Sequence, residues 1–318
     1  FADNNNKELE TRIEIKNNKL VSLDDQIYGF IVGFNLKLSD NSNSLSNFTH
    51  NHVKRIIRSM IKDKIIDFIK APADSINLGE IYNLDLKNKV QLYWGDEPVG
   101  YLKKGENIFS PTVEMIDSEL IDTDQKQKII FKLQEWIDNK IKIVLKPIRD
   151  DIQSEIKSSD LRSITYNLFN SLGTMKVDGF LTDLKNLTVE KKSIISKLGI
   201  RIGAKFFFIP NFIKKNAIEL KSLLWRIFNN DELSGNFPLP KNGRVCFTTE
   251  SKIPDEYWQA IGYLYINKFA VRIDVFERVF FLARKKIKFG PFLESSDLMN
   301  PLGCNSEQLA DILIYCGF

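Results

Sequence analysis

Hydrophobic positions along this 318-residue chain follow two periods, and each period predicts a different kind of element. Spacings of three and four residues, which place side chains on one face of a helix, recur in many stretches. They predict helices at residues 49–70, 122–147, 160–173, 187–199, 211–228, 254–261, 274–287 and 305–317. Pro72 and Pro147 end two of these patterns, because proline lacks the amide hydrogen that a helix interior needs.

Alternation of apolar and polar residues predicts strands in the intervening regions. Residues 11–40 read as a small antiparallel meander with turns at residues 17–18 and 24–25, where Asn and Asp pairs favour a turn. Residues 76–109 predict hairpins that turn at residues 87–89 and 95–98. A single strand is expected at residues 244–249, and a hairpin that turns at Asn267 is expected at residues 263–273.

The stretch from residue 198 to residue 230 mixes basic, aromatic and aliphatic residues more densely than any other part of the chain. Its first part alternates: Ile202 and Phe206 share one parity, whereas Arg201, Lys205 and Phe207 share the other. This alternation predicts a half-buried strand that ends before Pro210.

A helix is expected to follow, with Asn211 as its N-cap. One side of this helix forms an apolar stripe of Ile213, Ala217, Leu220, Leu224 and Ile227. The other side carries Lys214, Lys215, Lys221 and Arg226, with Trp225 among them. The pattern therefore predicts a basic helix face that contains an indole ring.

Together these elements predict an α+β fold of several small modules, with antiparallel hairpins and a helical middle. The expected modules are a β meander at residues 1–48, an α+β module at 49–150, a mainly helical basic module at 151–230 and a C-terminal α+β module at 231–318. The last boundary rests on the Gly- and Pro-containing stretch at residues 229–243. Because the chain begins with Phe1 and no initiator Met, we expect a piece of a longer protein.

Composition restricts the class of protein. No apolar run approaches the roughly 20 residues that cross a bilayer, so we expect a soluble chain with no membrane partner. Cys246, Cys304 and Cys316 form no C-x-x-C pair, which indicates neither a disulfide framework nor a structural zinc site. A reducing cytoplasm and core packing of the three thiols fit this pattern best.

Charge is distributed unevenly. Residues 185–226 contain ten Lys or Arg and two Glu, a balance of +8, whereas residues 72–124 contain eleven acids and four bases, a balance of −7. A basic surface with aromatic rings suits a polyphosphate backbone and its bases. The alternative is a solvated helix face in a Lys-rich chain. A second basic group at residues 268–288, with seven bases and two acids, either extends this track or complements a helix dipole.

Motifs for catalysis are missing from the sequence. Residues 100–106 have glycines at phosphate-loop spacing, but Glu106 stands where a phosphate-loop Lys is required and would repel a nucleotide. His50 and His52 lie at a helix start without neighbouring ligands. No catalytic residue, cofactor site or metal site is therefore assigned to this chain.

Several stretches resemble, in the same order, the C-terminal region of alphaproteobacterial DEAD/DEAH-box superfamily-2 helicases of the MgpS type, relatives of the mitochondrial degradosome helicase. These stretches are residues 90–116 with the following helix to residue 148, then 198–228, 257–279 and 300–318. The likeness covers roughly residues 19–318. In that family the motor domains, with their ATP and magnesium sites, lie upstream of this region, and this chain has no counterpart of their motifs.

The resemblance implies an accessory region of an ATP-dependent helicase that grips RNA or DNA, most simply as a single strand, beside the upstream motor domains. The charge and aromatic pattern places the contacts at Arg201, Lys205, Phe207, Lys214, Lys215, Lys221, Trp225 and Arg226. The alternative is a protein-interaction scaffold, in which the acidic region at residues 72–124 docks the motor or a nuclease partner.

Overall fold

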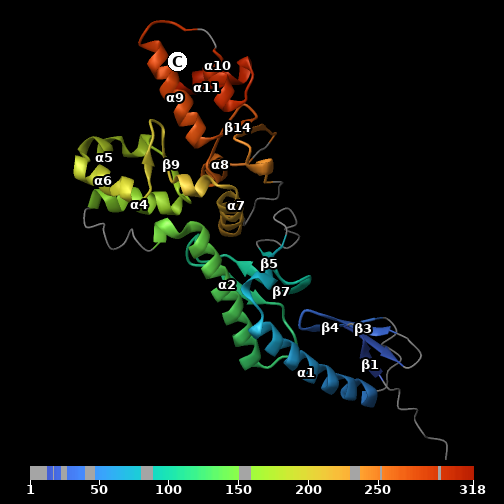
Figure 1. Cartoon of the computed structure of the whole chain (residues 1–318). Helices are drawn as coiled ribbons and strands as arrows, with labels where there is room; N and C mark the ends of the chain where they lie inside the picture. Colours follow the sequence, from blue (N-terminus) through green and yellow to red (C-terminus); the bar gives the residue numbers. More distant parts are fainter. Residues whose placement is uncertain are drawn as a thin grey trace, which may run out of the picture. The chain divides into compact units, whose positions relative to one another are not determined.

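The computed structural model describes residues 13–16, 18–22, 27–39, 47–79, 89–149, 159–229, 237–250, 253–292 and 295–318. The chain forms two compact units, and Figure 1 labels many of their elements. Unit 1 comprises Phe1–Glu80, Lys89–Lys103 and Thr112–Ile137, and unit 2 comprises Ile81–Asn88, Lys104–Pro111 and Asp138–Phe318. Small antiparallel sheets and helices occur in both, so the predicted α+β class is confirmed.

Unit 1 begins with a four-stranded antiparallel meander in the order β1-β2-β3-β4, as the alternation predicted. Its strands are β1 (Ile13–Lys16), β2 (Lys19–Ser22), β3 (Ile27–Val32) and β4 (Asn35–Leu38). Asn18 occupies the first turn with a φ of 63°, a left-handed conformation that asparagine tolerates. The predicted turn at residues 24–25 lies outside the described residues.

The rest of unit 1 contains a second antiparallel sheet, in the order β5-β6-β7-β8, together with one long helix and the first part of another. Its elements are α1 (Asn47–Lys70), the short helix η2 (Ala73–Ser75), β5 (Ile76–Leu78), β6 (Val90–Trp94), β7 (Glu97–Lys103), β8 (Thr112–Met115) and the first part of α2 (Thr123–Arg149). The predicted turn at residues 95–98 is confirmed, with Gly95 at a φ of 58°. The predicted turn at residues 87–89 falls largely outside the described part.

Packing inside unit 1 joins the meander to α1 and to the second sheet. Ile57, Ile61, Ile65 and Phe68 are buried at helical spacing on α1. The Phe68 ring lies 5.5 Å from the Phe34 ring and 5.3 Å from the Trp94 ring, in edge-to-face contacts. These contacts hold the β3–β4 turn, α1 and the β6–β7 hairpin in one fixed arrangement.

Unit 2 contains two three-stranded antiparallel sheets, ordered β10-β11-β9 and β12-β14-β13, surrounded by helices. Its first half comprises α4 (Ser159–Asn170), β9 (Thr174–Lys176), η3 (Asp178–Phe180), α5 (Leu181–Asn186), α6 (Val189–Lys197), β10 (Arg201–Ile202), β11 (Phe206–Phe208), η4 (Pro210–Ile213) and α7 (Lys215–Asn229). Its second half comprises η5 (Lys241–Gly243), β12 (Cys246–Thr248), α8 (Asp255–Ile261), β13 (Tyr263–Ile266), β14 (Phe269–Arg272), α9 (Ile273–Ile287), α10 (Ser296–Leu302) and α11 (Ser306–Cys316).

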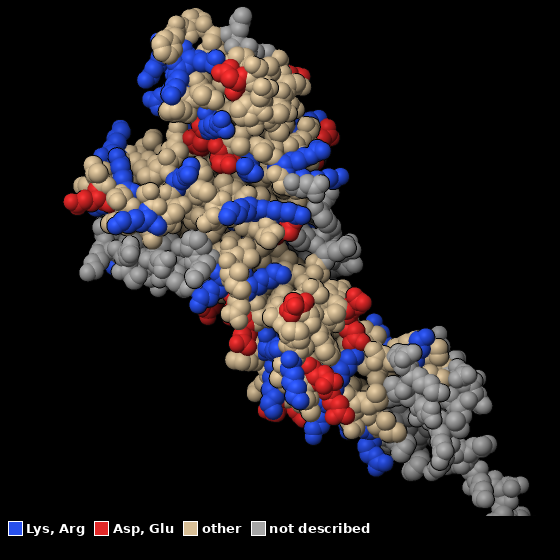
Figure 2. All heavy atoms as spheres, in the orientation of Figure 1, with Lys and Arg blue, Asp and Glu red and all other residues tan. Residues whose placement is uncertain are grey.

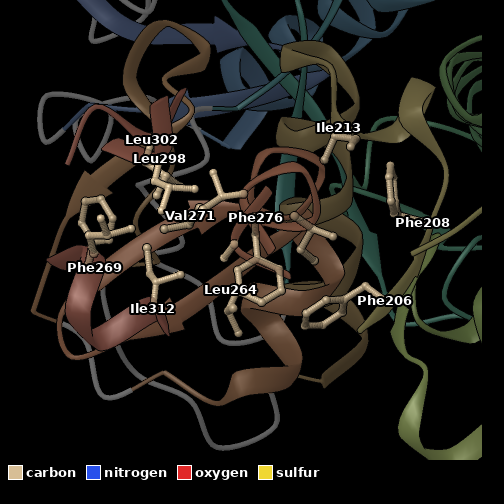
Figure 3. Close-up of a cluster of buried hydrophobic side chains, with 14 residues drawn as sticks. Phe206, Phe208, Ile213, Leu264, Phe269, Val271, Phe276, Leu298, Leu302 and Ile312 are labelled. Carbon is tan, nitrogen blue, oxygen red and sulfur yellow. The ribbon is translucent and has the colours of Figure 1, made fainter. Parts of the chain in front are cut away.

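A buried cluster of apolar side chains connects the two halves of unit 2 (Figure 3). Phe206 and Phe208 from β11 pack with Phe276 of α9, and the Phe206 and Phe276 rings meet edge-to-face at 5.8 Å. Leu298 of α10 and Ile312 of α11 complete the cluster from the other side. Residues 151–230 and 231–318, which the sequence suggested as separate modules, are therefore parts of one compact unit.

Local geometry differs from the expectation at residues 198–213. The chain forms a tight hairpin, β10 paired with β11, instead of one strand, and Phe206, Phe207 and Phe208 are all buried. Asn211 does not cap a helix, because it lies inside η4, and α7 starts at Lys215 after the extended Lys214. A single apolar–polar alternation cannot distinguish one long strand from two short ones.

Two later helices begin with residues whose side chains can act as N-caps. Asn305, where the sequence predicts that the last helix begins, caps α11 with a reciprocal hydrogen-bond pair to Gln308. Asp274 and Glu277 have the D-x-x-E spacing of a capping box for α9, but the box does not form, because Asp274 pairs with Arg272 and Glu277 faces a different loop. The hairpin that turns at Asn267 is confirmed by β13 and β14.

None of the helices that the structure describes is long and apolar enough to cross a membrane. The cysteines at positions 246, 304 and 316, all of them described, form no disulfide and are half-buried against the core of unit 2. Their expected use in core packing is thus confirmed.

Candidate nucleic-acid interface

The structure buries half of the side chains that the sequence placed at a nucleic-acid surface. The exposed fractions are 0% for Phe207, 0% for Lys221, 7% for Trp225 and 4% for Arg226. A buried ring cannot stack on a base, and a buried cation cannot reach a phosphate. The predicted nucleic-acid contacts of these four residues are therefore wrong for this fold.

Packing on both sides of α7 explains this burial. The predicted apolar stripe is confirmed, because Ile213, Ala217, Leu220, Leu224 and Ile227 are all buried. The opposite side is covered as well: the Trp225 ring meets Tyr257 of α8 at 5.3 Å, and the Arg226 guanidinium lies 4.7 Å from the centre of the Phe237 ring. Every residue from Leu220 to Ile227 is buried, so this part of α7 is a central core element rather than a binding face.

Lys205 is fixed in position by a carboxylate from α9. The backbone amides of Ala204, Lys205 and Phe206 donate to Glu277 at 2.7, 2.8 and 2.7 Å. Gly203 lies so close to this carboxylate that a Cβ atom there would come within 2.3 Å of the carboxylate carbon. The β10–β11 turn is thus anchored on α9, and the Lys205 ammonium lies 5.9 Å from the centre of the Phe280 ring.

Arg201, Lys214 and Lys215 are exposed, as the sequence predicted. Arg201 lies in β10, Lys214 precedes α7, and Lys215 is the first residue of α7. The two aromatic rings expected beside them, Phe207 and Trp225, are in the core. These cations could attract a phosphate, but the predicted site offers no ring on which a base could stack.

A different surface of unit 2 does combine exposed cations with exposed rings. It runs along α9 and one turn beyond its end, where Figure 2 shows blue Lys and Arg atoms gathered next to tan ones. We call the following exposed residues the α9 surface: Arg278, Phe281, Arg284, Lys285, Lys288 and Phe289.

Helical spacing makes the α9 surface continuous. Arg278, Phe281, Lys285 and Lys288 follow one another at intervals of three, four and three, which places them on one helix face, and Arg284 neighbours Phe281 at an interval of three. The opposite face of α9, including Phe276, is buried in the core of unit 2. Because one face of α9 is buried in the core, the cations on the opposite face point toward solvent.

The two rings on this surface are unusually accessible for phenylalanine. Phe281 is 57% exposed and Phe289 is 93% exposed. The Lys285 ammonium lies 4.6 Å from the centre of the Phe281 ring, a cation–π contact, whereas Phe289 is almost fully in solvent. Phe289 is therefore the ring most available for stacking.

A cation beside this surface is paired with a carboxylate, whereas three cations on the surface have no such partner among the residues that the structure describes. Lys286 pairs with Asp297 at 3.0 Å, which ties the end of α9 to α10. The nearby Ser295 hydroxyl and Lys286 ammonium hold the pKa of Asp297 below its ordinary value. No carboxylate among the described residues pairs with Arg278, Arg284 or Lys288. The α9 surface thus retains its positive charge for a ligand.

The sequence contained part of this result. The second basic group at residues 268–288 is apparent in the sequence, but the negative end of a helix accounts for its cations as well as a nucleic-acid track does. Phe281, Ile287 and Phe289 are interleaved with these cations, but Trp225 is interleaved with the cations of α7 and is buried, so this mixture alone does not reveal an exposed surface.

Comparisons of the chain with known proteins found no relative. No protein-family model, no curated protein and no solved structure matches it. Within the described part of the chain, no group of three or more His, Cys, Asp or Glu side chains could hold a metal ion. The resemblance to helicase C-terminal regions remains a prediction from the sequence.

Proposed function

We propose that unit 2 binds single-stranded RNA or DNA through the α9 surface. One observation carries this proposal: four cations and two exposed phenylalanine rings share one continuous face, and the described carboxylates leave that face uncompensated. Proteins that bind single strands without sequence preference combine these same two features, a positive track and stacking platforms.

The expected mechanism divides the work between the two kinds of side chain. Arg278, Arg284, Lys285 and Lys288 follow successive phosphates, and Phe289 stacks on a base. Stacking requires a base whose face is accessible, and a duplex hides both faces of its bases between neighbours. We therefore expect single strands to bind more tightly than duplexes of the same length.

An anionic membrane is the other large ligand that attracts basic and aromatic side chains. A helix that lies in a membrane interface needs a broad apolar face toward the lipid. The apolar face of α9, with Phe276, Val279 and Ala283, is already occupied by the core of unit 2. Phe281, Ile287 and Phe289 alone make a small apolar contribution, so the arrangement favours a nucleic acid.

Salt dependence tests the electrostatic part of the proposal. Four phosphate contacts on a single strand predict a log–log slope of Kd against salt of about 3, from about 0.7 per contact. The measurement is fluorescence anisotropy of a labelled oligo(dT) or oligo(U) strand over a range of salt concentrations. A slope near zero, or binding to anionic vesicles that exceeds binding to the strand, contradicts the proposal.

A pair of charge-matched variants tests the location. Replacing Arg284, Lys285 and Lys288 with Gln removes three cations from the α9 surface, and replacing Arg201, Lys214 and Lys215 with Gln removes three from the originally predicted region. We expect the first variant to lose most of the affinity and the second to lose little. Equal losses would indicate diffuse attraction, and the reverse order would move the site to the β10 and α7 region.

Ring substitutions test the stacking step. Phe289→Ala should weaken binding by about 5- to 150-fold, which corresponds to about 1–3 kcal/mol per stacked base. Phe289→Tyr is the matched control and should keep most of the affinity. An unchanged affinity in Phe289→Ala would show that no base stacks on this ring.

We further propose that this binding serves a helicase, as the likeness at residues 90–116, 198–228, 257–279 and 300–318 implies. The upstream reading frame tests this part separately. A phosphate-binding G-K-[ST] motif and an acidic helicase box in frame with this chain would support it. An upstream stop codon would contradict it and would leave the binding proposal intact.

A further inference from the structure

Unit 1 contains a cleft that the nucleic-acid proposal does not use. It has a volume of about 670 Å³. Its walls come from α1, from the β6–β7 turn and from the turn between β1 and β2. This volume lies within the range of roughly 300–1,000 Å³ that is usual for ligand sites.

The lining of the cleft is strongly acidic. Asp63, Asp67, Asp96 and Glu97 contribute four carboxylates, and Lys64 contributes the single cation. Asp63, Lys64 and Asp67 follow Met60 at intervals of three, four and seven on α1, so one helix face presents them together. Asp96 and Glu97 approach from the β6–β7 turn.

The one cation is already engaged. The Lys64 ammonium pairs with Glu97 Oε2 at 2.5 Å, and Asn18 donates to Glu97 Oε1 at 2.8 Å. These contacts fix Glu97 and join the meander to α1. Asp63, Asp67 and Asp96 are exposed and face the cleft without a described cationic partner.

The cleft also offers apolar and aromatic surface. Met60, Ile61 and Ile31 line it beside the carboxylates, and so does the half-buried Trp94. The Trp94 ring is held in place by Phe34 at 6.3 Å in a stacked contact and by Phe68 at 5.3 Å. A cleft that combines carboxylates with a tryptophan suits a guanidinium or ammonium group, and the apolar residues suit its aliphatic stem.

We infer that this cleft binds a basic, partly apolar segment of a partner protein, with an Arg or Lys side chain at Trp94. Charge complementarity excludes an anionic occupant, since three uncompensated carboxylates would repel it. A small polyamine would match the charge, but it would leave the apolar lining of Met60 and Ile61 without a partner. A peptide segment with alternating basic and apolar side chains uses both features.

The test uses the full chain and two labelled peptides. In one peptide Arg alternates with Leu, and in the matched peptide Gln replaces every Arg. Fluorescence anisotropy should show binding of the Arg peptide, weaker binding at high salt, and little binding of the Gln peptide. Equal binding of the two peptides would overturn the inference.

The cleft variant replaces Asp63, Asp67 and Asp96 with Asn, and it should raise the Kd of the Arg peptide about tenfold or more. The control variant replaces three acids that do not line this cleft with the corresponding amides: Glu119→Gln, Asp124→Asn and Glu135→Gln. These substitutions remove the same number of charges from unit 1 and should change the Kd by less than about twofold. Equal losses in both variants would show that the peptide responds only to overall charge.

A second variant keeps the result interpretable if the triple substitution disturbs folding. Asp96→Lys reverses one charge at an exposed turn position, beside Gly95, and should weaken the Arg peptide while the thermal unfolding midpoint stays unchanged. If spermidine displaces the peptide stoichiometrically at low concentration, the cleft is a polyamine site and the inference is wrong. Oligonucleotide affinity should stay unchanged in every cleft variant, so this inference and the nucleic-acid proposal can fail separately.

Discussion

Lys221 provides the strongest test of the packing around α7. Its side chain is 0% exposed, and its ammonium nitrogen has no hydrogen-bond partner within the described part of the chain. The nitrogen lies beside the end of α8, where a Cβ atom on Gly262 would be 3.7 Å away. Burial lowers the pKa of Lys221 from 10.5 to about 7. We predict that Lys221→Met stabilises the protein.

The magnitude follows from the difference between the folded and unfolded pKa values. A difference of about 3.5 pH units corresponds to about 5 kcal/mol at 1.36 kcal/mol per unit. Because the folded-state pKa is depressed, the stability linked to this group is fully present above pH 10.5, is lost progressively as the pH falls from 10.5 to 7, and is fully lost below 7. The advantage of Lys221→Met should therefore be about 5 kcal/mol at pH 6 and about 2 kcal/mol at pH 9.

Urea denaturation at several pH values measures this difference. Methionine has a similar length and no charge, so it fills the same space with little strain. Lys215→Met on the same helix is the matched control, because Lys215 is exposed, and it should change the free energy of unfolding by less than about 0.5 kcal/mol at any pH.

Two results would refute the reasoning about Lys221. One is an advantage of Lys221→Met that stays constant between pH 6 and pH 9, since a titrating buried amine requires a change. The other is a loss of stability at every pH, which would show that the ammonium group makes favourable interactions in the folded state.

Three further predictions concern contacts that shape unit 2, and each is checked by thermal or urea unfolding. Glu277→Ala should cost about 3 kcal/mol or more, because it leaves three amides of the β10–β11 turn without their acceptor, and a loss below about 1 kcal/mol would contradict that role. Gly203→Ala should cost about 1–3 kcal/mol because its Cβ would collide with Glu277, whereas Gly179→Ala, with open space around it, should be nearly neutral; similar effects at both positions would refute the steric argument. Asn305→Ala should cost about 1 kcal/mol through loss of the α11 cap, and no measurable change would mean that water replaces the cap.

Much of the fold could be predicted from local patterns. The apolar stripes of α1 and α7, the β13–β14 hairpin and the Asn305 cap depend on residues close together in the sequence. The role of Glu277 could not be predicted in this way. An Asp274–Glu277 pair at a helix start has the spacing of a capping box, and only the arrival of the β10–β11 turn shows that Glu277 binds elsewhere.

The candidate site failed for a related reason. Helical periodicity shows which residues share a face of α7, but it cannot show how many neighbours cover that helix. Tyr257 and Phe237 come from later segments and enclose Trp225, so an apparently polar face is in the core. On α9 the same mixture of cations and rings remains exposed, because no described element covers Phe281 or Phe289.

Photo-crosslinking tests the central claim about the α9 surface most directly. A single strand carrying photoreactive pyrimidines is irradiated with the full chain, and the attachment points are mapped by mass spectrometry. Attachment at Phe289, with or without Phe281, is the predicted result. Attachment confined to peptides outside residues 278–289 would contradict the claim that this surface holds the strand.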